Sequence, residues 1–195
     1  MTVASFVTLR PATRDDAAEL AILSDIASHG FASWLWLGEL GGTGSDTPME
    51  LGRLKMRQDE GYGTWRHAVL AEAYGETAGA AIGYALGEDV ESMEVDRVAL
   101  QPVIDLQKMV VGSWFIATLG VYSHLRGIGI GREILKGQID RAGSLPVSLI
   151  TASDNEAALS LYKKNGFSEA ARQKAMSLFE SSRKHEWVLL TRDAR

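Results

Sequence analysis

Cysteine is absent from the 195-residue sequence, and proline occurs only four times. Without cysteine, the chain can form no disulfide, no thiolate metal site and no cysteine nucleophile. A basic excess is also missing, because 20 lysines and arginines stand against 25 aspartates and glutamates, for a net charge of −5. This acidic balance argues against a broad nucleic-acid surface or binding to an anionic membrane. The lack of cysteine fits a reducing compartment, and we expect a cytoplasmic protein.

Long hydrophobic runs are missing as well. The segment Val110 to Leu125, which carries no formal charge, is shorter than the roughly 20 apolar residues of a membrane-spanning helix. The first residues lack the basic start and the apolar stretch of a secretory signal. A hydrophobic content of 46% and a charged content of 23% are typical of a globular protein. Since no repeat or linker interrupts the sequence, we expect one soluble domain spanning residues 1–195.

Strand and helix patterns alternate along the chain. The first part of the chain predicts a strand over SFVTLRPAT, a helix from Ala17 to Ser28 preceded by Thr13 as a cap, a loop or broken helix over HGFASWLWLGELGGTGSD, and a helix from Thr47-Pro48 to about Glu60. Three strands follow, over HAVLAEAYG, TAGAAIGYALG and WFIATLGV. The last part predicts a helix from the glycine-rich stretch to about Gly143, the strand PVSLITA, a short helix capped by Asp154 and ending at Lys164, and strands over 167–174 and 185–191. The segment 88–111 has no clear pattern. This order predicts an α/β fold in which helices flank a mixed sheet.

Three glycines, Gly127, Gly129 and Gly131, fall within five residues of the segment LRGIGIGREIL. Glycine weakens a helix or a strand by about 0.5–1 kcal/mol relative to alanine, so this cluster indicates a special backbone requirement. A glycine-rich turn between a strand and a helix leaves N–H groups free at the positive end of the helix dipole, where phosphate oxygens can approach closely. Arg126 and Arg132 add positive charge on either side. The pattern therefore indicates a diphosphate-binding turn.

Two nucleotide-binding folds use similar turns. The Rossmann fold requires G-x-G-x-x-G directly after a strand and an acidic residue about 20 positions later. Here Ile134 takes the place of the third glycine, polar residues Ser123 and His124 follow the strand, and too little chain remains after Asp154 to complete a doubly wound sheet. A P-loop also requires a lysine after the last glycine, which this sequence lacks. A dinucleotide-dependent reductase is therefore the weakest hypothesis.

Two segments resemble signatures of the GCN5-related N-acetyltransferase (GNAT) family. The stretch RGIGIG, residues 126–131, is similar to the family pattern R/Q-x-x-G-x-G/A, and NEAALSLYKKNGF, residues 155–167, is similar to N-x-x-A-x-x-L-Y-x-x-x-G-F. The two motifs occur in the expected order with one strand between them. The chain is therefore identified as a member of the GNAT family, which implies an acyl-CoA N-acyltransferase fold with a mixed, mostly antiparallel central sheet.

The resemblance implies direct transfer of an acetyl group from acetyl-CoA to an amine, without a metal. It assigns the coenzyme to backbone N–H groups and side chains of the turn and of its neighbours. The residues implied in cofactor binding are Leu119, Val121, Arg126, Gly127, Ile128, Gly129, Gly131, Arg132 and Asn155. The strand over 114–121 would pair with the pantetheine arm, and the N–H of Leu119 or Val121 would polarise the thioester carbonyl.

Two residues in this region have alternative roles. Gly120 could mark a bulge that separates the strand over 114–121 from the one over 146–152, or it could simply allow close packing. Asn155 would contact the pantetheine region in the family, and it could also cap its helix.

Tyr162 is the candidate catalytic residue. Its spacing on an apolar helix face would, by itself, suggest core packing with the hydroxyl at the edge. In the family, a tyrosine of this segment protonates the departing thiolate of CoA. Because a thiol has a pKa of about 8.5, the thiolate can also leave unaided, so loss of Tyr162 should slow the reaction without abolishing it.

The general base and the acceptor are less defined. Many family members carry a glutamate on the strand before the glycine turn, and WFIATLGV has none. The base would be a water relay or a carboxylate from the acidic segment, which could equally be a solvated loop. Its acidic residues are Glu88, Asp89, Glu91, Glu94 and Asp96. An aromatic group, Phe31, Trp34 and Trp36, could line the acceptor site, belong to the core or form a dimer contact.

We therefore expect an acetyl-CoA-dependent N-acetyltransferase that acts on the primary amine of a small molecule. The alternative is a domain of the same fold that senses acyl-CoA without catalysis; the missing strand glutamate supports this alternative, and Tyr162 opposes it. We expect no metal, no nucleic-acid partner and no membrane partner. A homodimer is compatible with the sequence.

Overall fold

The computed structural model describes residues 6–41, 44–178 and 184–194. Its strands are β1 (Val7–Pro11), β2 (Ala68–Ala73), β3 (Glu76–Ala85), β4 (Trp114–Val121), β5 (Val147–Ala152), β6 (Ser168–Lys174) and β7 (Glu186–Arg192). Its α-helices are α1 (Ala17–Ala27), α2 (Phe31–Leu37), α3 (Pro48–Met56), α4 (Gln101–Lys108), α5 (Ile130–Ala142) and α6 (Glu156–Lys164). Short 3₁₀ helices are η1 (Arg14–Asp16), η2 (Trp65–His67), η3 (Glu88–Ser92), η4 (Val98–Leu100) and η5 (Ser123–Leu125). Within the described ranges, no helix is both long enough and apolar enough to span a bilayer.

The strands follow the hydrogen-bonded order β1-β2-β3-β4-β5-β7-β6. The pairs β1–β2, β2–β3, β5–β7 and β6–β7 are antiparallel, whereas β4 and β5 run parallel. The parallel ladder joins Trp114–Ile116 to Val147–Leu149. This mixed, mostly antiparallel sheet with its flanking helices confirms the predicted fold class.

Two compact units make up the chain, and β4 contributes to both. The first unit contains the described residues up to Tyr84 together with Ala117–Arg141. The second contains Ala85–Ile116 and the described residues from Ala142 onward. The glycine-rich turn therefore belongs to the first unit, and α6 belongs to the second.

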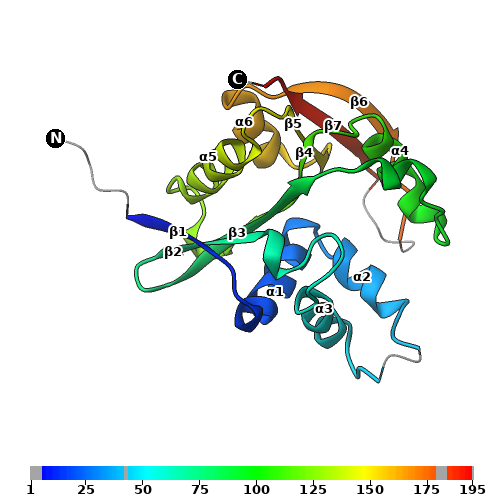
Figure 1. Cartoon of the computed structure of the whole chain (residues 1–195), viewed down its shortest axis with the longest axis horizontal. Coiled ribbons are helices and arrows are strands. Elements are labelled where there is room, and N and C mark those ends of the chain that lie inside the picture. Colours follow the sequence, from blue (N-terminus) through cyan, green and yellow to red (C-terminus); the bar gives the residue numbers. More distant parts are fainter. Residues whose placement is uncertain (1–5, 42–43, 179–183, 195) are drawn as a thin grey trace. The chain divides into compact units, whose positions relative to one another are not determined.

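In the first unit, a hydrophobic cluster lies between α5 and strands β1, β2 and β3. Its buried members are Val7, Ala71, Ala73, Ala78, Ala81, Leu125, Ile130 and Ile134. Helices α1, α2 and α3 lie on the other side of these strands (Figure 1). Leu119 and Val121 of β4 pack against the cluster through their side chains. The end of β4 is thus fixed by packing on the α5 side.

Helix α1 approaches the end of β4 very closely at Gly120. A Cβ atom placed on this glycine would lie 2.6 Å from the carbonyl oxygen of Leu23, which is shorter than any normal van der Waals contact. The absence of a side chain at Gly120 therefore allows the helix to pack directly on the strand. This contact supports the close-packing role expected for Gly120, and the bulge stays a prediction.

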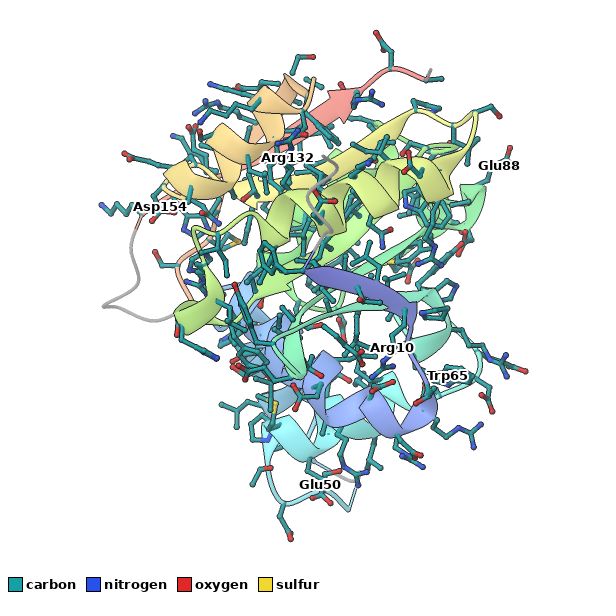
Figure 2. The ribbon with its side chains drawn as sticks, turned by 90° about the vertical axis from the view of Figure 1, so that its left-hand side faces the viewer. Arg10, Glu50, Trp65, Glu88, Arg132 and Asp154 are labelled. Atoms are coloured by element: carbon teal, nitrogen blue, oxygen red, sulfur yellow. The ribbon has the colours of Figure 1, made fainter. Side chains whose placement is uncertain are left out.

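The start of the first unit is fixed by a charged network around Asp16. The carboxylate of Asp16 accepts hydrogen bonds from the backbone N–H of Thr13 at 2.6 Å and from the Arg10 guanidinium at 2.7 and 2.8 Å. Arg10, labelled in Figure 2, also donates to Glu72 at 2.5 Å. Thr13 and Asp16 thus form a capping box, and the cap expected at Thr13 is confirmed. The pKa of Asp16 is held well below its ordinary value, chiefly by the hydrogen bonds from Arg10.

Part of the segment HGFASWLWLGELGGTGSD forms helix α2, where the sequence predicted a loop or a broken helix. Its first turn is capped by α1, because Asp25 accepts from the N–H of Ser33 at 2.8 Å and Ser28 accepts from the N–H of Ala32 at 3.0 Å. Trp36 is buried against Gly52 of α3, which leaves room for the indole ring. Trp36 is therefore a core residue. Residues 42 and 43 of the same segment lie outside the described residues.

In the second unit, β5, β7 and β6 are adjacent, and α4 packs against β6 and β7. The buried hydroxyls of Ser113 and Ser148 are 2.6 Å apart and join the segment before β4 to β5. The segment 88–111, which the sequence left unassigned, forms η3, η4 and α4. Other boundaries agree closely, except that α3 ends at Met56 and not near Glu60.

Replacing Gly120 by alanine should destabilise the first unit. The added methyl group would force α1 and β4 apart at Leu23, and overpacking of this kind costs about 1–3 kcal/mol. The free energy of unfolding from urea titration measures the effect. Gly41→Ala is the matched control, because a Cβ atom on Gly41 has no neighbour within 4 Å. Equal stability of the two variants would contradict the close packing of α1.

Candidate active site

The glycine-rich turn connects η5 to α5, and two of its glycines adopt left-handed conformations. The φ angles are +81° at Gly127 and +100° at Gly129, which residues with a side chain rarely adopt. Both glycines are exposed, and a Cβ atom on either would face open space. The glycines are therefore required by the backbone conformation, and the turn is accessible to a ligand.

Several backbone N–H groups of this turn are unused. In the part of the chain that the structure describes, the N–H groups of Gly127, Ile128, Gly129 and Gly131 have no acceptor. The N–H of Arg132 already donates to the carbonyl of Gly129 at 3.0 Å. Because α5 is a thirteen-residue helix, these free donors lie at the positive end of an extended dipole. The arrangement is suited to an anion such as a diphosphate.

Arg126 and Arg132 flank the turn, and both are exposed. The Nε of Arg126 donates to the carbonyl of Val121, the last residue of β4, at 2.9 Å. The side chain of Arg132 projects from the first turn of α5 (Figure 2). Ile128 exposes 44% of its surface between them. Two guanidinium groups thus add to the positive potential of the helix end.

Polar side chains connect α1 to β4 on either side of Gly120. The hydroxyls of Ser24 and Thr118 are 3.4 Å apart. The hydroxyl of Tyr122, directly after β4, donates to the carboxylate of Glu19. Desolvation, together with this hydrogen bond, raises the pKa of Tyr122 well above its ordinary value. The sequence analysis identified neither Glu19 nor Tyr122, because no local pattern distinguishes this pair.

In the second unit, Asn155 is the N-cap of α6. Its side-chain oxygen accepts from the N–H of Ala158 at 3.2 Å. The sequence analysis predicted Asp154 as the cap, which is wrong, since Asp154 lies one residue earlier in an exposed turn. The capping role expected for Asn155 is therefore correct, while its contact with pantetheine stays a prediction.

Tyr162 is buried in α6, with 7% of its surface exposed. Its ring lies against Phe167, with the ring centres 5.8 Å apart. No hydrogen-bond partner of its hydroxyl is found among the described residues. Burial raises the pKa of Tyr162 to about 12, so the hydroxyl keeps its proton throughout the neutral range. Tyr162 is therefore packed in the hydrophobic core with a hydroxyl that stays protonated and can donate a hydrogen bond.

The acidic segment of the second unit is open to solvent. All five candidate carboxylates, at Glu88, Asp89, Glu91, Glu94 and Asp96, belong to exposed residues. Among the described residues, no group of three or more histidines, aspartates and glutamates is arranged to hold a metal ion. In the first unit, Phe31 and Trp34 stack with their ring centres 5.8 Å apart and remain partly exposed.

Comparisons with known proteins agree with this geometry. A profile of the Acetyltransferase (GNAT) family matches residues 29–167. An N-acetyltransferase from Staphylococcus aureus Mu50 is similar in structure, with a TM-score of 0.65 and 22% identity over 94% of this chain and 99% of that chain. The yncA structure from Salmonella typhimurium, which contains its cofactor acetyl-CoA, has a TM-score of 0.59 and 19% identity over 96% and 93%.

Another similar structure is the ribosomal-protein-S18-alanine N-acetyltransferase from Escherichia coli. Its TM-score is 0.58, with 15% identity over 95% of this chain and 92% of that chain. No curated protein has a significantly matching sequence. At these identities the solved structures establish the fold. The family profile covers well over half of the chain, and the chain therefore belongs to the GNAT family of acetyltransferases. Acetyl transfer is its general activity, and acetyl-CoA is the donor that the family supports.

The raised pKa of Tyr162 predicts a loss of stability at high pH. Between pH 10, the ordinary tyrosine value, and about 12, the folded protein holds this proton more tightly than the unfolded chain. The contribution of this proton to the free energy of unfolding is fully present below pH 10 and is lost as the pH rises through 12. Tyr162→Phe should therefore reduce the fall in unfolding free energy over this range, as measured by urea titration at several pH values. Tyr74→Phe, which alters a tyrosine that is 70% exposed, is the control. An unchanged pH dependence in Tyr162→Phe would contradict the assignment.

Proposed function

We propose that this protein transfers the acetyl group of acetyl-CoA directly to the primary amine of a small molecule in the cytoplasm, acting as a single N-acetyltransferase domain. The observation that carries the proposal is the set of free N–H groups at the start of α5. Neither a structural turn nor a helix cap explains why two left-handed glycines, separated only by Ile128, hold these donors open to solvent. A diphosphate explains both features.

The N–H groups of Ile128, Gly129 and Gly131 are the direct donors to the diphosphate in this proposal. The N–H of Arg132 shares its hydrogen between the ligand and the carbonyl of Gly129, as happens commonly at helix ends. Arg126 then neutralises the ligand while it remains bonded to Val121. Gly127 provides a left-handed backbone conformation in the turn and a further free N–H group.

The end of β4 is proposed to hold the pantetheine arm and the thioester. A backbone N–H at Leu119 or Val121 would donate to the thioester carbonyl and stabilise the negative charge that develops there. Rigid packing on both faces supports this role, because α5 contacts the side chains of Leu119 and Val121 while α1 contacts Gly120. Asn155, whose side chain caps α6, is also proposed to contact the pantetheine arm.

Tyr162 is proposed to donate to the sulfur as the C–S bond breaks. A thiol has a pKa of about 8.5, so a phenol with a pKa of about 12 is the weaker acid. Complete proton transfer to the thiolate would therefore be uphill, and Tyr162 would act mainly as a hydrogen-bond donor to the developing charge. The thiolate then takes its proton from the amine being acylated or from solvent.

The acceptor is proposed to be a small cationic amine. The exposed carboxylates of η3 and of the following segment create a negative potential that attracts such a molecule, and the transfer needs no metal. A protein acceptor is the alternative, since the Escherichia coli relative acts on ribosomal protein S18 according to its name. The alternative is tested by including an amino-terminal peptide among the acceptors.

Gly129→Ala should weaken acetyl-CoA binding by about 10-fold or more. A side chain at a φ of +100° strains the turn and moves its N–H groups, each of which contributes a charge-assisted hydrogen bond. Gly143→Ala is the matched control, because Gly143 lies beyond the other end of α5 with a φ of +62° and open space around a Cβ atom. Both variants should lose about 1–2 kcal/mol of stability. Isothermal titration with acetyl-CoA should distinguish them, and equal affinities would contradict the diphosphate site.

Release of free thiol from acetyl-CoA in the presence of a panel of primary amines tests the reaction itself. Tyr162→Phe should lower kcat by about 10- to 100-fold on the best amine and should change the Kd of acetyl-CoA little, because the phenol acts in the transition state. Acetyl-CoA binding without thiol release on any amine or peptide would favour the non-catalytic acyl-CoA sensor. An unchanged kcat in Tyr162→Phe would remove this residue from the mechanism.

A further inference from the structure

The carboxylate of Glu19 is positioned at the end of β4 by Tyr122. The N–H of Tyr122 donates to the carbonyl of Ala78 at 3.0 Å, which fixes its backbone beside β3. From there its hydroxyl reaches across to α1 and donates to Oε2 of Glu19. Both residues are only partly exposed. The pair is therefore a fixed feature of the first unit.

The second oxygen of Glu19, Oε1, has no partner among the residues that the structure describes. A carboxylate oxygen can accept a hydrogen bond or a proton, and an alkylammonium group can donate either. Glu19 is thus a carboxylate with one oxygen fixed and the other available.

The other carboxylates of α1 and of the turn before it are already paired. Asp15, which is exposed, lies 3.7 Å from the guanidinium of Arg57. Asp16 accepts from the Arg10 guanidinium and from Thr13. Asp25 accepts from the N–H of Ser33 and caps α2. In contrast to these three, the Glu19 carboxylate accepts its one side-chain hydrogen bond among the described residues from Tyr122, the residue that follows β4.

Glu19 also lies along the stretch of β4 to which the proposed function assigns the acyl group. Helix α1 contacts this stretch at Thr118 through Ser24, at Gly120 through Leu23 and at Tyr122 through Glu19. Leu119 and Val121, the proposed donors to the thioester and to pantetheine, alternate with these contacts. The carboxylate therefore belongs to the helix that borders the reacting segment.

We propose that Glu19 accepts the proton that the acceptor's ammonium group must lose, and that Tyr122 is its positioning residue. This inference rests on the proposed function. The ammonium R–NH3⁺ gives one proton to the Glu19 carboxylate, and the neutral amine attacks the thioester carbonyl carbon. The C–N bond forms, the C–S bond breaks, and the remaining excess proton on nitrogen passes to the departing thiolate. Glu19 then returns its proton to solvent.

Among the described residues, the charged or titratable groups beside the pair include His124 and Glu76 on one side and Asp16 on the other. The ring of His124 stacks on Tyr122 with the ring centres 6.2 Å apart, and its Nε2 lies 3.4 Å from Oε2 of Glu76. On the side of α1, Asp16 is neutralised by Arg10. Because the pKa of Tyr122 is raised, its hydroxyl stays protonated between pH 7 and 10 and keeps Glu19 in position.

The test is the pH dependence of kcat/KM for Glu19→Gln, measured by thiol release with the best amine of the panel. The amide oxygen still accepts the hydrogen bond from Tyr122, so the fold is preserved. At pH 7 the kcat/KM of the variant should be roughly 100-fold lower than that of the unsubstituted protein, because this is the usual contribution of a general base. The loss should shrink as the pH approaches the acceptor's own pKa, about 10 for an alkylamine, because the amine is then already neutral.

Asp25→Asn is the matched control, since it removes a partly buried carboxylate from the same helix and keeps an oxygen for Ser33. It should retain the unsubstituted protein's pH profile. Tyr122→Phe should show a smaller loss than Glu19→Gln with the same recovery at high pH. A loss in Glu19→Gln that is equal at every pH, or no loss, would overturn the inference while leaving the proposed function intact. Absence of thiol release by the unsubstituted protein on every acceptor would overturn both.

Discussion

The direct contact of α1 with β4 at Gly120 is the constraint on which the site in the first unit depends. A helix backbone rests on a strand backbone here, because the missing side chain allows a carbonyl group of α1 to approach. This contact fixes which helix residues reach the strand, and it places Ser24 and Glu19 opposite Thr118 and Tyr122. On the opposite side of β4, Leu119 and Val121 are anchored in the cluster beneath α5. The strand therefore enters the glycine turn with little freedom to move.

Most of this fold follows from local sequence signals. The alternation in β1, the reciprocal cap at Thr13, the Thr47-Pro48 helix start and the glycine turn are each encoded within a few neighbouring residues. These signals predicted the order of the strands along the chain correctly, and two spaced motifs were enough to identify the family. Glycines at a fixed spacing are recognisable in a sequence because few other residues can adopt the backbone conformation that such a turn requires.

The remaining features depend on contacts between distant residues. Helix α2 begins where Asp25, at the other end of a tight turn, caps it, and no residue just before Phe31 gives the usual signal. Whether Asn155 or Asp154 caps α6 depends on the residue at which the helix begins, and a shift of one position changes the cap. Glu19 and Tyr122 are separated by about half of the chain and meet only after folding. Many family members carry a glutamate on the strand that corresponds to β4, whereas in this chain the carboxylate at the end of β4 comes from α1.

The bond between Arg126 and the carbonyl of Val121 has a consequence for ligand affinity. Arginine side chains normally lose considerable rotational freedom when they bind a phosphate, and this entropy loss reduces the affinity. Here the long side chain is already restrained by the strand before any anion arrives. Much of the ordering cost of Arg126 is therefore met during folding, so that an anion bound at the proposed diphosphate site would associate and depart without reorganisation of this side chain.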